Sequence, residues 1–237
     1  MKVNKITTII CFGIAIILSI PILLNIDNQI IMNISYGLFT GTIVSAIISL
    51  IAYFSEKEKL ISLAKSNLNS LYLNLLTMSN EVGKNINLIF ESEYIEEFHF
   101  KNAYDLSELN IKFISNINLE MYSPFYPKSR TAKVFEMLKE FKLDTYIIRK
   151  IAFDLNSNVL IYDLEYTESK PNISQRKNAI NIRNAKFHEY LKSKIIEIDK
   201  IGNILYKQKK NNMNWNNIKN VLCLEAEDIL KNNNETM

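Results

Sequence analysis

The fold of this chain is decided by the stretch YGLFTGTIVSAIISLIAYF, residues 36–54, which contains no charged side chain. A helix rises about 1.5 Å per residue, so roughly 20 residues cross the ~30 Å hydrocarbon core of a bilayer. A second uncharged run of similar length, ITTIICFGIAIILSIPILL, occupies residues 6–24. Two such runs are difficult to bury inside a soluble domain of a 237-residue chain. The sequence therefore predicts a transmembrane hairpin over residues 1–54, with spans at 6–24 and 36–54.

Basic residues predict how this hairpin is oriented. Lys2 and Lys5 precede the first run and Lys57 follows the second, whereas the connector at 25–35 contains no basic residue. The positive-inside rule then places both termini in the cytoplasm and the connector outside. The first run also lacks a cleavage site of small residues, so we expect a retained anchor rather than a signal peptide. The expected location is the cell membrane, with the lipid bilayer as a partner.

The second run carries a stripe of small residues, one at every fourth position: Gly37, Gly41, Ser45 and Ser49. Small residues allow helices in a membrane to approach closely. One interpretation is that the stripe packs against the first run, where Gly13, Ala15 and Ser19 would accept it. The other is that the stripe forms the seam of a homo-oligomer or lines a pore. The first interpretation is favoured.

A long helix is predicted to leave the membrane, because no Pro or Gly occurs between Phe54 and Val82. This stalk helix is expected over residues 55–96. It carries apolar residues at alternating steps of three and four, which define a stalk seam: Ala64, Leu68, Leu71, Leu75, Met78 and Val82. Such a seam is compatible with pairing to a second copy of the chain and with packing inside one chain, which we favour. Gly83 is expected to be a hinge.

The rest of the chain, residues 97–232, is predicted to be a helical bundle. Helical periodicity and breaks indicate helices at 105–122, 129–141, 144–168 and 174–210, and a last helix that begins near Trp215. Asp105 is expected to cap the first of these helices, and Gly202 to end the long basic one early. Residues 158–166 are rich in Val, Ile and Tyr and fit either a helix or a strand. The predicted fold class is all-α, with a cytoplasmic domain over 55–237.

Charge is divided between two segments of this domain. Residues 81–122 contain 8 acidic and 3 basic side chains, whereas residues 174–210 contain 10 basic and 3 acidic ones. Packing of the basic helix beside the acidic segment is favoured, and contact of the basic helix with anionic lipid headgroups is the alternative. Because no base-reading motif accompanies the basic residues, no nucleic-acid partner is expected.

The motifs of known catalytic and cofactor sites are missing from the sequence. It has no glycine-rich phosphate loop, nucleophile elbow or paired-cysteine metal motif. Glu96 and His99 have the spacing used in di-iron helix bundles, but the second copy that such sites require is absent. We therefore expect no enzyme, no catalytic residue, no cofactor and no metal.

Two hypotheses about function follow. The leading one is a membrane-anchored helical interaction or scaffold protein, whose partner is a second copy of the chain or an unidentified cytoplasmic protein. The alternative is a two-span pore-forming or membrane-disrupting effector that its cytoplasmic domain gates.

Overall fold

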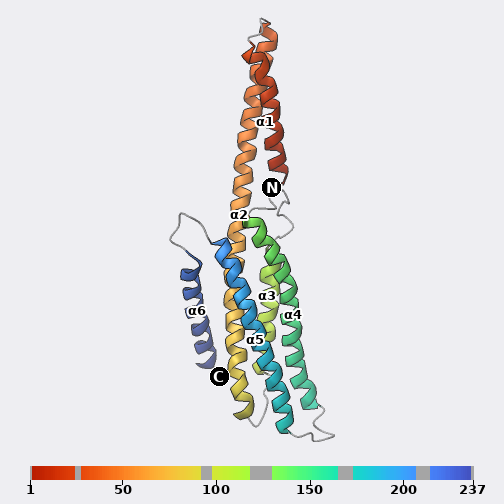
Figure 1. Cartoon of the computed structure of the whole chain (residues 1–237), viewed down its shortest axis with the longest axis vertical. Helices are drawn as coiled ribbons and strands as arrows, with labels where there is room; N and C mark the ends of the chain where they lie inside the picture. The colour runs from red at the N-terminus through yellow and green to blue at the C-terminus, as the bar shows by residue number, and fades with distance from the viewer. Residues whose placement is uncertain are drawn as a thin grey trace. The chain divides into compact units, whose positions relative to one another are not determined.

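The computed structural model describes residues 2–24, 28–91, 98–117, 130–164, 173–206 and 214–235. In these ranges the secondary structure is entirely α-helical, without a strand, so the predicted all-α class is confirmed. The helices of the described residues (Figure 1) are α1 (Lys2–Leu23), α2 (Gln29–Glu91), α3 (Phe98–Asn116), α4 (Arg130–Leu164), α5 (Ile173–Leu205) and α6 (Trp215–Glu235).

The chain divides into two compact units. Among the described residues, the hairpin unit comprises those up to Ser62, and the helical unit comprises those from Leu63 onward. The helix α2 contributes to both units, because it is continuous from Gln29 to Glu91.

The start of α2 is fixed by Asn28. Its side-chain Oδ1 accepts hydrogen bonds from the backbone N–H groups of Ile30 and Ile31, at 3.0 and 3.3 Å. These donors have no partner inside the helix, so an asparagine cap stabilises the first turn. From this cap the helix passes Phe54 without interruption, as the sequence predicts.

Gly83 is not a hinge in this structure, because α2 continues through it as far as Glu91. A Cβ atom at this position would lie 3.0 Å from the imidazole Cε1 and Nε2 atoms of His188 on α5. The missing side chain therefore allows α5 to approach α2 closely. A glycine inside a helix has two common explanations, flexibility and close packing, and here the contact with His188 favours packing.

Buried asparagines connect α2 to its neighbours in the helical unit. The Nδ2 of Asn74 donates to the backbone oxygen of Leu106 at 2.6 Å and to Oδ1 of Asn110 at 2.8 Å, both on α3. The Nδ2 of Asn184 on α5 donates to the backbone oxygen of Val82 at 2.9 Å. A buried amide is costly without a partner, so these bonds favour one register of α2 against α3 and α5.

The next helices pack in chain order, α3 against α4 and α4 against α5, with one difference from the sequence prediction. Residues 129–141 and 144–168 were predicted as separate helices, but α4 runs unbroken from Arg130 to Leu164. The predicted break is wrong because the Asp144 carboxylate, a typical cap, is instead engaged by Lys194 and Tyr190 of α5. Residues 158–164 are helical, which excludes the strand alternative there, while 165 and 166 lie outside the described residues.

The helix α3 also begins earlier than its sequence indicates. It starts at Phe98, so Asp105 lies in its interior and is not a cap. The predicted end at 122 is also wrong, because α3 ends at Asn116. A capping residue is a local signal, and packing of the turns before it overrides that signal here.

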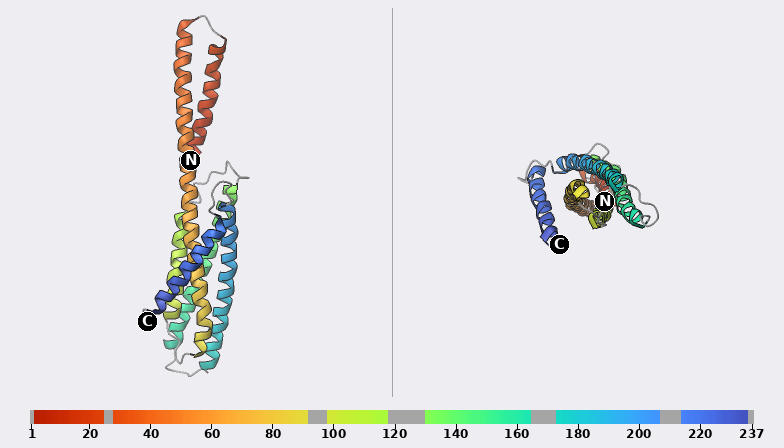
Figure 2. Two further views of the ribbon diagram at one scale, coloured as in Figure 1. Left: turned by 90° about the vertical axis from the view of Figure 1, so that its left-hand side faces the viewer. Right: turned by 90° about the horizontal axis from the view of Figure 1, so that it is seen from below.

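The helix α6 lies on the opposite side of α2 from α4 (Figures 1 and 2) and is anchored by Trp215. The indole stacks on Tyr206, the residue after the end of α5, with ring centroids 5.3 Å apart, and it meets Tyr72 of α2 edge-on at the same separation. Its Nε1 donates to Oδ1 of Asp199 at 2.7 Å, and the ammonium of Lys219 pairs with the same oxygen at 2.7 Å. These contacts join α2, α5 and α6 at one point.

Gly202 leaves the space that the Trp215 indole occupies. It lies inside α5, which continues to Leu205, so the prediction that Gly202 ends the helix early is wrong. A Cβ atom at Gly202 would lie 2.3 Å from Cε2 of Trp215, a distance at which one of the two groups must move. The glycine is therefore explained by the indole that covers it.

We expect Gly202→Ala to displace Trp215 and to lower the free energy of unfolding by about 1–3 kcal/mol through overpacking. Trp215 is the only tryptophan, so the fluorescence of the detergent-solubilised protein reports its displacement. The emission should shift to the red as the indole becomes exposed. Gly13→Ala is the control, since a Cβ there has open space around it. An unchanged emission spectrum and unfolding midpoint for Gly202→Ala would contradict the proposed fit.

Candidate functional site

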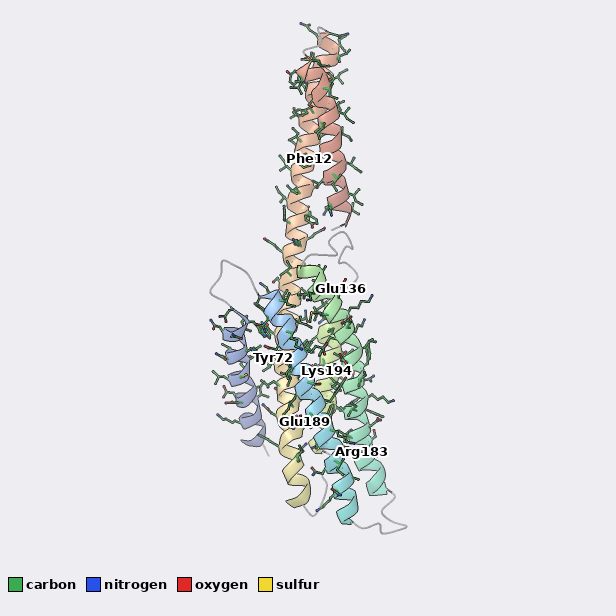
Figure 3. All side chains as sticks on the ribbon, in the orientation of Figure 1. Phe12, Tyr72, Glu136, Arg183, Glu189 and Lys194 are labelled. Atoms are coloured by element: carbon green, nitrogen blue, oxygen red, sulfur yellow. The ribbon has the colours of Figure 1, made fainter. Side chains whose placement is uncertain are left out.

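The hairpin unit exposes an apolar surface that is unusual for a folded unit. By length and composition, α1 and the first part of α2 can each cross a membrane, and only 11% of each apolar stretch is buried. Large side chains such as Phe12 point away from the helices (Figure 3). The two helices bury a narrow line of contact instead: Thr8, Ala15, Ser35, Ala46 and Tyr53. Packing between the two helices therefore leaves most of their apolar surface uncovered.

The small-residue stripe does not face α1. Gly37, Gly41 and Ser45 are exposed and Ser49 is half-buried. A Cβ atom added at Gly37, Gly41 or Gly13 would meet nothing within 4 Å. The favoured interpretation, in which the stripe packs against the first span, is therefore not the arrangement found. The stripe is an open surface of the single chain.

The stalk seam has the opposite environment. The side chains of Ala64, Leu68, Leu71, Leu75, Met78 and Val82 are all 0% exposed within the single chain. The Sδ of Met78 lies 3.4 Å from Nδ2 of Asn110 on α3, which shows what covers this face. In this arrangement the stalk seam has no surface left to offer a second copy. Asn85, which continues its spacing, is also buried.

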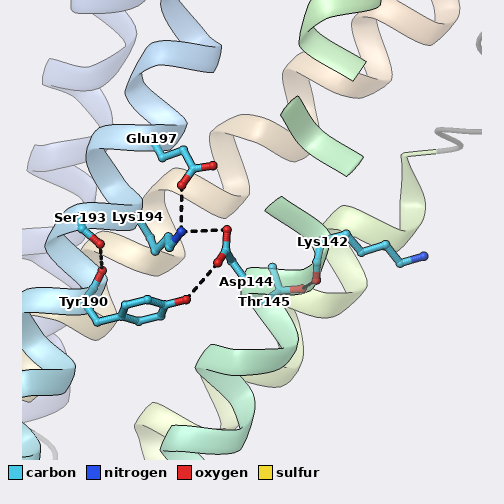
Figure 4. A network of polar contacts seen from close by, with 7 residues as sticks. All are labelled: Lys142, Asp144, Thr145, Tyr190, Ser193, Lys194 and Glu197. Atoms are coloured by element: carbon cyan, nitrogen blue, oxygen red, sulfur yellow. Dashed lines mark hydrogen bonds and ion pairs between the residues drawn. The ribbon is translucent and has the colours of Figure 1, made fainter. Parts of the chain in front are cut away.

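A partly buried polar network joins α4 and α5 beside this core (Figure 4). The ammonium of Lys194 lies 2.9 Å from Oδ2 of Asp144 and 2.9 Å from Oε2 of Glu197. The hydroxyl of Tyr190 donates to the other oxygen of Asp144 at 3.0 Å. Each group is thus held by a partner on the neighbouring helix or one turn away. The network is a clamp between α4 and α5.

Protonation states in this network follow from its geometry. Burial lowers the pKa of Lys194, but its hydrogen bonds to Asp144 and Glu197 outweigh burial and leave that pKa above its ordinary value. Burial, together with the hydrogen bond to Asp144, raises the pKa of Tyr190 to about 12. At neutral pH the lysine is therefore charged and the tyrosine keeps its donor hydrogen. These two protonation states suit stable pairing with the carboxylate of Asp144.

A surface groove of about 460 Å³ continues from this network along α4 and α5. Its lining residues are Ile151, Asp154, Leu155, Arg183, Lys186, Phe187 and Tyr190. Leu155 and Phe187 are buried and form an apolar floor, while Arg183 and Lys186 are exposed at its edge. A second hollow, of about 510 Å³, lies beside Trp215, and three of its seven lining residues are asparagines, Asn203, Asn214 and Asn216.

One buried carboxyl group stands apart from these features. Oε2 of Glu81 on α2 is buried and lacks a hydrogen-bond partner among the described residues. Burial raises the pKa of Glu81 to about 7, and the nearby charge of Lys84 opposes this shift.

Potential metal ligands and the two cysteines are the remaining features of the described residues. No group of three His, Cys, Asp or Glu side chains in them is placed to hold a metal ion. Cys11 and Cys223 are free thiols. The side chain of His99, half of the metal spacing noted in the sequence, lies outside the described residues.

Sequence reasoning missed the clamp, the groove and the Trp215 anchor. Asp144 was interpreted as a helix start, and Lys194 as one of many cations in a basic segment. The sequence holds one hint of this network. Glu197 follows Lys194 by three residues and Lys194 follows Tyr190 by four, which is the spacing of side chains on one helix face. The pairing across to α4 leaves no local signal.

The chain was compared with protein-family models, curated proteins and solved structures, and none of them matches it.

We expect Lys194→Met to lower the free energy of unfolding by about 1–3 kcal/mol, because it leaves the partly buried carboxylates of Asp144 and Glu197 without their cation. Thermal unfolding followed by circular dichroism measures the change. Lys192→Met is the matched control: Lys192 pairs with Glu189 on the same helix, and these side chains are 51% and 72% exposed. Loss of that exposed pair should cost less than about 1 kcal/mol. Equal effects of the two substitutions would show that the clamp contributes nothing beyond a surface ion pair.

Proposed function

We propose that this protein is a membrane-anchored helical interaction or scaffold protein. In this proposal α1 and the first half of α2 cross the cell membrane as a hairpin, and the helical unit is a cytoplasmic bundle with both termini on its side. The observation that carries the proposal is the uncovered apolar surface of the hairpin unit.

Soluble proteins rarely expose contiguous apolar patches larger than a few hundred Å². Here exposed large side chains follow α1 and α2 on several faces, from Val3 to Phe54. The 22 residues of α1 span about 33 Å as a helix, close to the ~30 Å thickness of a hydrocarbon core. Lipid is the solvent that suits this surface.

The helical unit supports a binding role. Its stalk seam is satisfied within the chain, so the unit does not need a second copy to complete its core. It presents a groove between α4 and α5, and α5 carries an excess of cations over anions. A folded unit with an open groove and a cationic face fits recruitment of a cytoplasmic protein to the membrane.

The orientation is tested by labelling single cysteines. In a Cys11→Ser, Cys223→Ser background, Asn28→Cys in the connector should react with a membrane-impermeant maleimide added to intact bacterial cells. Glu227→Cys on the exposed face of α6 should react only after lysis. Labelling of Glu227→Cys in intact cells would reverse the topology, and recovery of the protein in the soluble fraction would remove the membrane proposal altogether.

A second candidate function is favoured by the small-residue stripe. Gly37, Gly41 and Ser45 form an open surface on a helix that is otherwise covered with large apolar side chains. Small residues are a usual basis for association of helices in lipid, where no hydrophobic force drives helices together. Copies of the chain that associate through this stripe would hold hydroxyl groups close to one another. This is the arrangement that a pore-forming or membrane-disrupting effector requires.

Membrane potential separates the two candidates. If the spans form a pore, induced expression in a bacterial host should rapidly depolarise the membrane, as reported by a voltage-sensitive dye. Gly41→Leu should then abolish depolarisation, because the larger side chain blocks close approach of helices. Val44→Leu, on an exposed large-residue face of the same helix, is the matched control and should change nothing. An unchanged potential with normal growth would favour the scaffold over the pore.

A further inference from the structure

The groove between α4 and α5 has the chemistry of a peptide site. We propose that it binds an acidic amphipathic helix of a cytoplasmic protein. This inference rests on the proposed function, since it requires the helical unit to face the cytoplasm, and it identifies the kind of partner that the unit recruits.

The floor of the groove is apolar. Leu155 is 4% exposed and Phe187 is 1% exposed, and Ile151 lies one helical turn before Leu155. The apolar surface extends past these residues. Ile147 is 46% exposed one turn before Ile151, and Ile182 is 48% exposed one turn before Lys186. A ligand seated here would cover apolar side chains that the chain itself leaves in water.

The edge of the groove is cationic and unpaired. Arg183 and Lys186 are exposed, and neither has an ion pair among the described residues. Two other cations of α5 already have partners: Lys192 pairs with Glu189, and Lys194 pairs with Asp144 and Glu197.

Asp154, the one carboxylate of the groove lining, already takes part in an interaction within the chain. With Arg183 and Lys186 against this one carboxylate, the lining carries a net positive charge, and complementary potentials favour an acidic ligand.

The shape favours a helix over a small molecule. The site is an open groove along two helices and is not an enclosed cavity. From Arg183 to Tyr190 the α5 wall covers seven steps, or about 10 Å, which is two turns of helix. An amphipathic helix that docks in such a groove uses apolar anchors at positions i, i+3 or i+4, and i+7, which span the same length. Acidic residues beside these anchors would meet Arg183 and Lys186.

An anionic lipid surface is the competing explanation for the two cations. It would use Arg183 and Lys186 but would have no need of the apolar floor between α4 and α5. A helix uses both features, so the floor favours the helix.

The test uses the full chain in nanodiscs and a display library of helical peptides about four turns long. Their anchor positions carry Leu, Ile, Phe or Met, and the remaining positions are random among Glu, Lys, Gln and Ala. Enriched peptides are measured by fluorescence anisotropy against the wild type and against an Arg183→Glu, Lys186→Glu double variant. Lys200→Glu is the matched charge control, because Lys200 is exposed on α5 and does not line the groove. Ile147→Ser tests the exposed apolar surface that continues from the floor of the groove, with Val221→Ser on α6 as its control.

Enriched peptides should be rich in glutamate. Their affinity should fall about tenfold or more with the double reversal, fall with Ile147→Ser, and remain unchanged in both controls. Trp215 fluorescence verifies that each variant is folded. The inference is overturned if no peptide is enriched over empty nanodiscs, if lysine-rich peptides are enriched, or if the double reversal has no effect. It is also overturned if the protein binds phosphatidylglycerol vesicles through Arg183 and Lys186 and binds no peptide.

Failure of this inference is distinguishable from failure of the proposed function. If the maleimide pattern of Asn28→Cys and Glu227→Cys is as expected and no peptide binds, the groove assignment alone is wrong. If acidic peptides bind but Glu227→Cys is labelled in intact cells, the groove stands and the cytoplasmic placement of the helical unit is wrong.

Discussion

The helix α2 is the constraint on which the rest of the structure depends, because one unbroken helix must satisfy two kinds of surroundings. Its first half is apolar on nearly every face and leaves those side chains uncovered. Its second half is apolar along one face only, and the stalk seam from Ala64 to Val82 is entirely covered by its own chain. The helical unit is assembled on that seam: Asn74 and Val82 bond to α3 and α5, and Tyr72 contacts the indole that holds α6.

Two glycines show how neighbouring helices approach one another in this unit. Gly83 and Gly202 both lie inside helices, where a glycine ordinarily costs stability. Each faces a ring from another helix, the imidazole of His188 and the indole of Trp215. The loss of helix propensity is thus accompanied by close ring contacts, which a Cβ atom would crowd at Gly83 and could not share without a shift at Gly202. Each contact needs both the glycine and the ring on the neighbouring helix, His188 or Trp215. Neither residue alone indicates the contact in the sequence.

Periodicity made the general architecture predictable, whereas contacts between distant residues were not. Spacing of three and four identified the stalk seam from Ala64 to Val82, and an absence of Pro and Gly after Phe54 indicated one long helix. Local signals failed where tertiary contacts used the same residue differently, as with Asp144, a plausible cap that is bound by Lys194 instead. The groove could not be predicted from the sequence for a similar reason. Ile151 and Phe187 lie 36 residues apart and meet only because α4 and α5 pack together.

The buried carboxyl group of Glu81 couples the fold to proton concentration. Its pKa is about 7 in the native state against 4.5 for a free side chain. Between these values the native protein keeps a proton that the unfolded chain has released, so the free energy of unfolding falls as pH rises through that window, by at most about 1.4 kcal/mol per pH unit. The protonated carboxyl group therefore contributes stability in acid, and a rise toward pH 7 charges a group that has no hydrogen-bond partner for Oε2 among the described residues. The contribution of this one carboxyl group to the stability of the helical unit is therefore largest in acid and declines as pH rises toward 7.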